Sequence, residues 1–398
     1  MIVLDYAIVV IALVLFIPVL ILCTQVLLAA WSLGSASQVL PVNAIRRPSV
    51  AVIVPAHNEE HGLANTLAHI MPQMTADDQL VVVVDNCTDH TAEVARASGA
   101  ITLVRFNQQY RGKGYALDHG MKYLHKHPPE VVMIVDADCE ISANLIDTLA
   151  KQCVALQRPI QANYVMQFPS TKSTKQQVVE FAWLVKNTIR PLGYQQLGLP
   201  CQLMGTGMAF SWHDLAQSNL ASGHLVEDMK LGLDLAQAGR YPYYTQAAEV
   251  KSYFPTSLEG LATQRARWEH GHLGVIVTEL PKYLWSAIRQ KRWAMLAQVL
   301  DLMVPPLALL FVSAVALWLV ALVDWWLSHS VLPLALATGV LGLLGSGILL
   351  AWLFFGRKII GLKSLLLAPI ILLMKIPLYI KFVVSRQVDW VRSKRDQH

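Results

Sequence analysis

The sequence predicts an α/β domain, built on a largely parallel sheet, that apolar helices attach to a membrane. Three observations carry this prediction. Short aliphatic runs alternate with helical patterns between residues 50 and 238, three uncharged stretches are long enough to cross a bilayer, and basic residues flank those stretches. Strands that alternate with helices favour parallel βαβ units, and continuous aliphatic runs are typical of strands buried on both faces of a sheet.

The composition indicates an integral membrane protein. Of 398 residues, 54% are hydrophobic and only 15% are charged, whereas about a quarter of the residues in soluble domains are charged. The mean hydropathy is +0.42. Three stretches without charge, Ala7–Ala30, Leu302–Val323 and Val331–Phe355, are each long enough to span a bilayer. A removable signal peptide is not expected, because the first stretch is too long and lacks a basic start.

Basic residues place the large polar segment on the cytoplasmic side. They cluster at one end of each predicted span, at Arg46, Arg47, residues 282–292, Arg357 and Lys358. The opposite ends carry Asp5, Asp324 and His329. The positive-inside rule then predicts a multi-pass protein of the inner (plasma) membrane whose large domain is cytoplasmic.

The last apolar stretch, residues 359–384, admits two interpretations. Three lysines interrupt it, and its charge-free core, residues 364–374, is too short to span. We expect an interfacial segment bent by two prolines, with a fourth span as the alternative. The predicted parts are an N-terminal transmembrane helix (1–45), a cytoplasmic domain (46–256), interfacial helices (257–292), two transmembrane helices (293–356), and an amphipathic segment with a basic cytoplasmic tail (357–398).

Several function classes are excluded by what the sequence lacks. The five cysteines show no paired spacing and no zinc pattern. The net charge of +5 reflects the residues that flank the membrane spans, so nucleic acid is not an expected partner. The chain contains no Gly-x-x-x-x-Gly-Lys-Ser/Thr, and no Gly-x-Gly-x-x-Gly follows its first strand, which argues against a P-loop enzyme and a dinucleotide dehydrogenase.

The predicted strands follow one another in a regular order. They are residues 50–55, 80–84, 101–104, 131–135 and 160–168. A helix is expected to follow the first strand from Leu63, and a second, capped by Thr88 or Asp89, to end near Ala97. Further helices are expected to begin at the 111–114 turn, to span residues 174–193, and to begin at Glu227. Ligands of such sheets bind at the carboxyl ends of the strands, so the loops there are candidate sites.

Asp136 and Asp138 follow the central strand, residues 131–135, and are the first candidates. Two carboxylates so close together repel each other unless a cation joins them. A hard divalent ion completed by substrate phosphates meets that need. A strand end with aspartates favoured by the turn explains the same pair without a metal.

Four further motifs each have a functional and a structural explanation. Lys113, between two glycines, could place an ammonium on a phosphate or lie in a solvated loop. The glycine-rich 203–208 stretch could approach a ligand or form an ordinary turn. Glu227 and Asp228 open a helix, where the helix dipole by itself favours acidic residues. Alternatively, an aspartate at this position could accept a proton from an acceptor hydroxyl. The 264–268 segment, Gln-Arg-Ala-Arg-Trp, could hold a diphosphate and a sugar or lie at the membrane interface.

The order of these motifs is similar to one family. A carboxylate loop after the second strand, a lysine in a glycine loop, Asp-x-Asp, Glu-Asp and Gln-x-x-Arg-Trp succeed one another, with membrane spans on both sides. The chain thus resembles membrane-bound glycosyltransferase family 2, which contains cellulose, hyaluronan and poly-N-acetylglucosamine synthases and ceramide glucosyltransferase. The resemblance covers about Ser49 to Trp268 and implies a GT-A-type, Rossmann-like parallel or mixed sheet with about three spans and an interfacial helix.

The resemblance implies a role for each motif. Asp228 would be the general base and Glu227 its catalytic neighbour. The donor would contact Pro55, Ala56, Glu59, Asp85, Lys113, Asp136, Asp138 and Arg267. Asp138, with Asp136, would bind Mg²⁺ or Mn²⁺. The acceptor would contact Gly205, Thr206, Gln264 and Trp268, and we also expect Tyr110, Trp212 and His224 near it.

The implied activity is inverting transfer of a hexosyl or N-acetylhexosaminyl group from a UDP-sugar. Because the chain has fewer spans than channel-forming synthases, we favour a lipid-linked sugar or lipid acceptor in extracellular polysaccharide or glycolipid synthesis. Membrane lipids and other polysaccharide-assembly proteins are the further partners that the resemblance allows. The alternatives are a processive polysaccharide synthase and a non-catalytic sugar-nucleotide-binding scaffold of an export complex.

Overall fold

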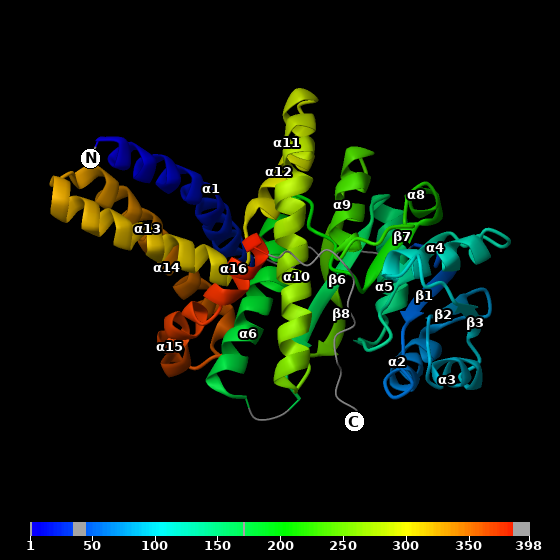
Figure 1. Ribbon diagram of the computed structural model, residues 1–398. Helices are drawn as coiled ribbons and strands as arrows, with labels where there is room; N and C mark the ends of the chain where they lie inside the picture. Colours follow the sequence, from blue (N-terminus) through cyan, green and yellow to red (C-terminus); the bar gives the residue numbers. More distant parts are fainter. Residues whose placement is uncertain (1, 35–44, 170–171, 385–398) are drawn as a thin grey trace. The chain divides into compact units, whose positions relative to one another are not determined.

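The computed structural model describes residues 2–34, 45–169 and 172–384, and the chain forms two compact units (Figure 1). The helical unit comprises Met1–Ala36, Ser170–Leu197 and Ala297–Arg386. Among the described residues, the sheet unit comprises 45–169 and 198–296. The predicted basic tail beyond residue 384 lies outside the described residues.

The sheet unit is built on a mixed sheet of eight strands in the order β3-β2-β1-β4-β7-β6-β8-β5. β1, β2, β3 and β4 are parallel to their neighbours among these four, whereas β7 is antiparallel to both β4 and β6, and β5 is antiparallel to β8. The expected parallel or mixed sheet is therefore confirmed. The strands are β1 Val50–Ala56, β2 Gln79–Asp85, β3 Ile101–Arg105, β4 Val131–Ile134, β5 Glu140–Ile141, β6 Ile160–Gln167, β7 Met208–Ser211 and β8 Tyr243–Tyr253.

Helices connect these strands much as the helical spacing predicts. Those of the sheet unit are α2 Leu63–Ile70, α3 Thr91–Ala97, α4 Lys113–Leu124, α5 Leu145–Leu156, α8 Trp212–Ala216, α9 Glu227–Gln237, α10 Leu258–Thr278 and α11 Leu280–Arg289. α12 (Trp293–Met303) crosses the boundary between the two units. The expected cap of α3 at Thr88 or Asp89 is not found, because the N-cap residue is His90 and it makes no side-chain capping bond. The Asp89 carboxylate does accept a hydrogen bond from the Thr91 backbone N–H at 3.1 Å.

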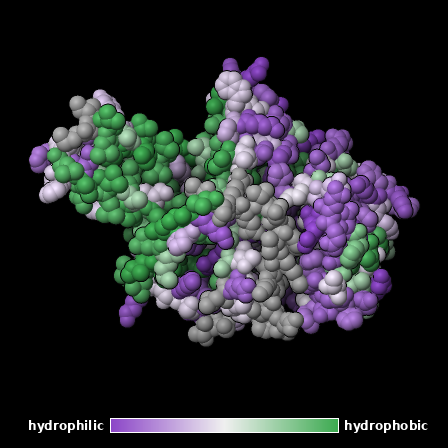
Figure 2. Space-filling view, in the orientation of Figure 1, coloured by the Kyte–Doolittle hydropathy of each residue, from purple (hydrophilic) through white to green (hydrophobic). Residues whose placement is uncertain are grey.

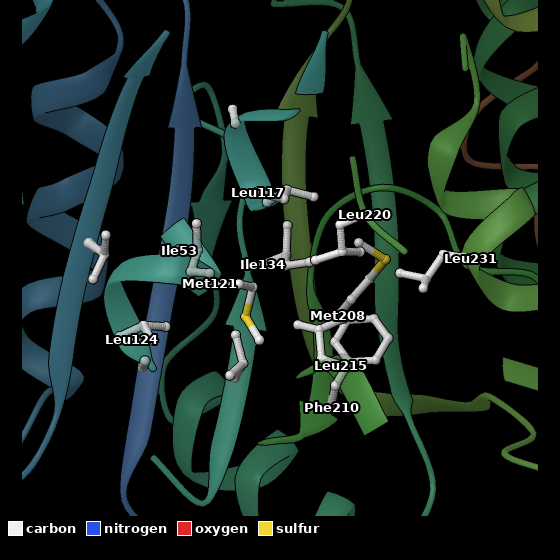
Figure 3. Close-up of a cluster of buried hydrophobic side chains, with 14 of the residues drawn as sticks. Ile53, Leu117, Met121, Leu124, Ile134, Met208, Phe210, Leu215, Leu220 and Leu231 are labelled. Atoms are coloured by element: carbon white, nitrogen blue, oxygen red, sulfur yellow. The ribbon is translucent and has the colours of Figure 1, made fainter. Parts of the chain in front are cut away.

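One apolar cluster holds α4 and α9 to the sheet (Figure 3). Ile53 of β1 meets Leu117 and Met121 of α4 in this cluster, and Leu231 of α9 belongs to it as well. Burial of each such side chain contributes about 1.5–3 kcal/mol. The cluster therefore fixes the first turns of α4 and α9, which carry Lys113 and the Glu227–Asp228 pair.

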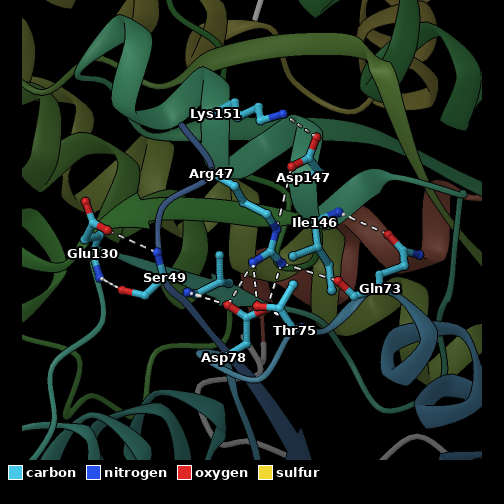
Figure 4. A network of polar contacts seen from close by, with 10 residues as sticks. Arg47, Ser49, Gln73, Thr75, Asp78, Glu130, Ile146, Asp147 and Lys151 are labelled. Atoms are coloured by element: carbon cyan, nitrogen blue, oxygen red, sulfur yellow. Dashed lines mark hydrogen bonds and ion pairs between the residues drawn. The ribbon is translucent and has the colours of Figure 1, made fainter. Parts of the chain in front are cut away.

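A polar network anchors the start of the sheet (Figure 4). The Arg47 guanidinium donates two hydrogen bonds to Asp78, at 2.7 and 3.1 Å. The Asp78 carboxylate also accepts from the backbone N–H groups of Val50 at 2.9 Å and Thr75 at 2.7 Å. Burial opposes ionisation of Asp78, but these donors outweigh it and lower the pKa of the carboxyl. Arg47, which the sequence indicates only as a basic residue beside the first predicted span, therefore also pairs with Asp78 inside the sheet unit.

The helical unit contains four helical segments that are long and apolar enough to cross a membrane: Val3–Ser32, Leu307–Ser328, Val331–Gly356 and Leu362–Phe382. The first three match the predicted spans. Apolar side chains cover α1, α13 and α14 in Figure 2. The helices of this unit are α1 Ile2–Ser32, α6 Thr174–Leu184, α7 Arg190–Gln195, α13 Leu307–Ser328, α14 Val331–Ala351, α15 Leu362–Leu373 and α16 Ile376–Val384, with π-helical turns at Val185–Ile189 and Trp352–Gly356.

The fourth candidate lies within residues 359–384, for which the sequence favours an interfacial segment and leaves a fourth span as the alternative. By length and composition Leu362–Phe382 qualifies as a span. It consists of α15 and α16, which a turn at Met374–Lys375 separates. The number of candidate spans among the described residues is therefore four, one more than the three that the sequence predicts.

A buried polar cluster joins three segments of the helical unit. The Arg190 guanidinium donates to Asp301 Oδ1 at 2.7 Å and to Gln25 Oε1 at 3.1 Å, and the Gln25 amide donates to the same Asp301 oxygen at 2.7 Å. Gly193 lets α7 approach α1 closely, because a Cβ there would lie 2.0 Å from the Gln25 carbonyl oxygen. Residues 172–197 thus group with the helices, although they fall inside the predicted domain 46–256.

Candidate functional site

Four candidate donor residues lie at or just beyond the ends of neighbouring strands. Pro55 and Ala56 end β1 and pair with residues of β2, which ends at Asp85. β4 lies on the other side of β1 and leads into Asp136. The loops after these strands therefore start at one edge of the sheet, as the ligand-binding loops of α/β sheets do. His57 joins two of the loops, since its Nδ1 lies 2.6 Å from the Asp85 carbonyl oxygen.

Asp85 is paired with an arginine that the sequence analysis missed. Arg105 donates to Asp85 Oδ1 at 2.5 Å, and both side chains are nearly buried, while the Asn86 amide donates to the same oxygen at 3.1 Å. Arg105 also donates to the Tyr110 carbonyl at 2.6 Å and lies 5.6 Å from the Tyr115 ring. Arg105 ends β3 and pairs with Asp85 at the end of β2, so the two side chains could be placed together only from this strand pairing.

Glu59 is held in a loop that is bonded to the one after β2. Its backbone N–H donates to Thr91 Oγ1 at 2.8 Å. The Asn58 N–H donates to Cys87 Sγ at 3.1 Å, and the Thr88 N–H donates to Asn58 Oδ1 at 2.7 Å. Asn58 has φ 54°, a left-handed conformation that asparagine tolerates. These bonds fix the geometry of the two loops relative to each other.

Lys113 lies among the candidate acids. Its ammonium forms an ion pair with Asp136 Oδ1, donates to the Gly205 carbonyl at 2.8 Å and lies 3.9 Å from Glu227 Oε1. Asp136 is fixed through its backbone N–H, which donates to Thr206 Oγ1 at 3.0 Å. The structure thus brings together residues from β4, α4, α9 and the 203–208 loop.

Gly205 lies where these groups converge. Its φ is +90°, and a Cβ there would lie 3.4 Å from Asp228 Oδ2 and 3.6 Å from Lys113 Nζ. Burial raises the pKa of Glu227 to about 7, with Asp228 adding to the shift and Lys113 opposing it. Burial alone would lower the pKa of Lys113, but the charges of Asp136 and Glu227 raise it above its ordinary value. The site therefore contains a permanent cation and an acid that titrates near neutrality.

Asp136 and Asp138 have the chemistry of ligands for a hard divalent cation. Asp138 Oδ2 accepts a hydrogen bond from Ser252 Oγ of β8 at 3.4 Å, which orients that carboxylate. Among the described residues, no three His, Cys, Asp or Glu side chains gather in a way that could hold a metal by themselves. Two carboxylates fit an ion that substrate phosphates complete, as Mg²⁺ sites commonly require.

The glycines near Lys113 serve a packing role that the sequence did not indicate. A Cβ at Gly114 would lie 2.4 Å from the Leu220 carbonyl oxygen and 2.7 Å from that of Ser222. The close approach in this motif is therefore between α4 and the 220–222 loop. Gly207 likewise faces Val250, whose Cγ2 would lie 2.5 Å from an added Cβ. Of the glycines in the 203–208 loop, only Gly205 lies against candidate site residues.

The Gln-x-x-Arg-Trp segment forms part of α10. Gln264 is buried, and Arg267 and Trp268 follow it on the same helix. One turn later, a Cβ on Gly271 would lie 2.7 Å from Val226 Cγ1, the residue before Glu227. α10 therefore packs directly against the start of α9. The structure places the motif on a helix that adjoins the catalytic candidates.

The three residues expected near an acceptor are not found together. Tyr110 lies 5.4 Å from the Tyr115 ring, near Arg105. Trp212 packs edge-on against His125 at 4.9 Å. His224 lines a pocket that Glu227 and Asp228 also line. Of the three, His224 is the one that shares a cavity with the predicted base.

Comparison with known proteins identifies the family. A family model described as glycosyltransferase like family 2 matches residues 48–271. The chain belongs to this family. The match covers the sheet from before β1 through the Gln-x-x-Arg-Trp segment of α10, which is the part of the chain that carries every site candidate.

Curated relatives of this family member are glycosyltransferases where a function is given. A 4,4'-diaponeurosporenoate glycosyltransferase of Staphylococcus haemolyticus is 26% identical over 202 residues, which are 46% of this chain and 50% of that protein. Its counterpart in Staphylococcus aureus is 34% identical over 106 residues, 26% of this chain and 28% of that protein. An uncharacterised protein of Methanocaldococcus jannaschii is 33% identical over 97 residues, 24% and 38% of the two chains. The chain spans half or less of the length of these relatives.

A solved structure of similar fold covers nearly the whole chain. The mannosyltransferase of Pyrobaculum calidifontis in complex with GDP-Man and Mn²⁺ superimposes with a TM-score of 0.58 and 17% identity, over 96% of this chain and 100% of that one. The similarity extends beyond the sheet and confirms the expected GT-A-type fold with apolar helices.

Proposed function

We propose that this family 2 member is an inverting glycosyltransferase that moves a hexosyl or N-acetylhexosaminyl group from a UDP-sugar to a lipid-linked acceptor. One observation carries the proposal: Lys113, Asp136, Glu227 and Asp228 converge on Gly205 at the ligand-binding edge of the sheet. A base, a cation and metal-ligating acids in one place are the parts that sugar transfer from a nucleotide requires.

In the proposed reaction an acceptor hydroxyl oxygen attacks the anomeric carbon of the donor. The bond from that carbon to the β-phosphate oxygen breaks on the opposite face, and UDP leaves with the electron pair. Asp228 takes the proton of the acceptor hydroxyl, help that is typically worth 10²–10⁴ in rate. Displacement from the opposite face inverts the anomeric configuration.

The leaving diphosphate needs positive charge around it. Asp138 and Asp136 would hold Mg²⁺ or Mn²⁺, and the bound ion supplies charge stabilisation to the diphosphate. Lys113 adds a fixed cation beside Asp136, and Arg267 lies on the helix that packs against the start of α9. Groups already placed before the reaction stabilise developing charge without reorganisation.

The donor base would lie near Asp85, with Pro55, Ala56 and Glu59 around it. The Asp85 carboxylate can accept a hydrogen bond from uracil N3–H, and Arg105 holds it in position. A carboxylate can equally accept from the N–H groups of guanine. Because the mannosyltransferase of similar fold binds GDP-Man, the donors tested should include GDP-mannose beside the UDP-sugars.

The membrane arrangement suits an acceptor that lies in the bilayer. α11 exposes Trp285 and Ile288, with Lys282 and Arg289 on the same helix. Apolar rings with flanking basic side chains favour the interface with anionic lipids. We therefore propose that α10 and α11 lie at the cytoplasmic surface of the inner membrane, where the acceptor, membrane lipids and other polysaccharide-assembly proteins are the partners.

A donor panel tests the proposal. Membranes that contain the full chain are incubated with labelled UDP-sugars, GDP-mannose and Mn²⁺ or Mg²⁺, and nucleotide release is measured. We expect release from a UDP-sugar and a loss of at least 10²-fold in Asp228→Asn, with Asp77→Asn, an exposed aspartate of the same unit, as the matched control. Full activity in Asp228→Asn contradicts the mechanism.

The same experiment separates the alternatives. A single added sugar supports transfer to a lipid-linked acceptor, whereas a ladder of products supports a processive synthase. Tight UDP binding without turnover of any donor supports a non-catalytic scaffold. The complete set of acids counts against the scaffold, since a binding protein has no use for a base at Asp228.

A further inference from the structure

α11 has two unlike faces. Its buried residues recur at the spacing of one side of a helix: Leu280, Tyr283 and Ala287. The exposed residues on the opposite side, which we call the outer face of α11, include Lys282, Trp285, Ile288 and Arg289. Two large apolar side chains therefore lie together on an exposed surface, with Trp285 67% exposed. Exposed apolar surface rimmed by polar groups is typical of a binding face.

The charge of this part of the chain favours an anionic partner. The sequence has no Asp or Glu between residues 280 and 300, whereas it has four basic residues there: Lys282, Arg289, Lys291 and Arg292. α11 also precedes, along the chain, the candidate membrane span that begins at Leu307. Exposed apolar side chains next to basic ones favour bilayers whose headgroups are anionic. The partner that fits the outer face is therefore the surface of an anionic lipid bilayer.

The buried face of α11 is hydrogen-bonded to α9 through Tyr283. The Tyr283 hydroxyl donates to Asp234 Oδ1, and Lys230 Nζ donates to Tyr283 Oη at 3.1 Å. Lys230 also donates to both Asp234 oxygens, at 2.7 and 2.6 Å. Tyr283 is 1% exposed, so its part of this network is shielded from water. Hydrogen bonds to charged groups are roughly twice as strong as neutral ones, and the network therefore ties α11 to α9.

Two further contacts adjoin this tie. On the outer face, Lys282 Nζ lies over the Tyr283 ring, 5.1 Å from its centroid. Just after α11, Arg292 Nη1 donates to the Gln237 carbonyl oxygen at the end of α9, at 2.5 Å. α9 begins with the Glu227–Asp228 pair. The helix that carries the candidate catalytic acids at its start is thus held by α11 and the residues after it farther along.

We propose that the outer face of α11 binds anionic lipid headgroups and that Tyr283 passes this contact to α9, so that an anionic bilayer surface steadies the helix of the catalytic acids. The inference rests on the proposed function, in which Asp228 on α9 is the base. Headgroups that bind Lys282 and Arg289 favour the state in which α11 is folded against α9, because a ligand stabilises every contact of the state that it binds. The proposed transferase then works best on an anionic leaflet.

Hydrogen–deuterium exchange of the full chain in lipid nanodiscs tests this proposal. The discs contain phosphatidylcholine alone or an equal mixture of phosphatidylcholine and phosphatidylglycerol, and no nucleotide or metal is added. Amide exchange is followed in two peptides, residues 227–237 and 280–293. We expect both peptides to exchange on the order of tenfold more slowly in the mixture, because two basic side chains gain anionic neighbours there.

Paired variants locate the contact and its route. Lys282→Gln combined with Arg289→Gln should reduce the slowing to less than about threefold in both peptides. Lys122→Gln combined with Lys126→Gln removes the same charge at two exposed lysines of the same unit and, as the matched control, should keep the full effect. Tyr283→Phe should keep the slowing in α11 but reduce that in α9 by at least about threefold, because the ring stays packed while the hydroxyl that bonds α9 is lost.

Each outcome decides the proposal. Equal exchange of α11 in the two kinds of disc overturns the lipid surface, and a response of α11 without one in α9 overturns the coupling. Equal effects of the α11 and α4 charge variants overturn the location, and an unchanged α9 response in Tyr283→Phe overturns the route. A lipid response in a protein that releases no nucleotide supports the inference and refutes the proposed transferase, whereas nucleotide release without a lipid response does the reverse.

Discussion

Replacing Asp78 with asparagine is expected to lower the melting temperature of the sheet unit by about 6 to 20 °C. The side chain of Asp78 is 0% exposed and that of Arg47 is 21% exposed. The change removes the nearer of the two carboxylates that contact Arg47. It also turns an amide N–H₂ group toward other hydrogen-bond donors. Breaking a buried pair in this way costs about 3–5 kcal/mol, and each kcal/mol corresponds to about 2–4 °C in a domain of this size.

The assay is thermal unfolding of the full chain in detergent, followed by intrinsic fluorescence at one scan rate. Asp147→Asn is the matched control, because Asp147 contacts the same Arg47 at 3.6 Å but is 40% exposed. An exposed pair of this kind is worth less than about 1 kcal/mol. The stability of Asp78→Asn should also depend less on pH in the acid range than that of the unmodified protein. The pKa of Asp78 is lowered by folding, so the stability it contributes is present above its ordinary pKa and is lost as the pH falls below that.

Equal melting temperatures for Asp78→Asn and Asp147→Asn would refute this reasoning. That result would mean that the backbone donors, rather than Arg47, account for the stability of the network. Arg47 would then contribute little to folding, and its position beside the predicted first membrane span would be the remaining explanation for it.

Three further predictions concern charge, pH and packing. Arg190→Met should cost about 3–5 kcal/mol, because it leaves the buried Asp301 without its charged partner. Adding Asp301→Asn should recover most of the melting temperature, and no recovery would contradict a paired cluster. Glu227 has a pKa of about 7 in the folded chain, so the folded state holds a proton that the unfolded state releases. The stability should therefore fall as the pH rises from 5 to 8. In Glu227→Gln this fall should be smaller, and an unchanged slope of melting temperature against pH would contradict the raised pKa. Gly271→Ala should lower nucleotide release by about 10²-fold, because it pushes α10 away from the start of α9, and Val226→Ala should rescue it; failure of the rescue would place the cause elsewhere.

The positions of many candidate donor residues could be predicted from local pattern. Aliphatic runs that end in Asp85 and Asp136 mark buried strands, and the ends of such strands meet at one edge whatever the rest of the chain does. The helix start at Glu227 and the turn before Lys113 are likewise visible in the sequence. These features depend on residues close to one another along the chain, which is why they could be located without coordinates.

The rest depends on contacts between distant segments. Arg105 could be placed beside Asp85 only once the pairing of β3 with β2 was known. The glycine at 114 is adjacent to a loop more than 100 residues later, so its packing role leaves no local signal. The helical segment 174–195 looks like a helix of the sheet domain, yet Arg190 ties it to α1 and α12 in the helical unit.

The most direct test of the converging acids is Mn²⁺ binding, measured by electron paramagnetic resonance of the full chain with and without UDP. We expect Mn²⁺ to bind in the presence of UDP and binding to weaken at least about tenfold in Asp138→Asn. Binding should persist in Asp228→Asn, because we propose that carboxylate as a base rather than a ligand. Unchanged Mn²⁺ affinity in Asp138→Asn, or an equal loss in Asp228→Asn, would contradict the site described above.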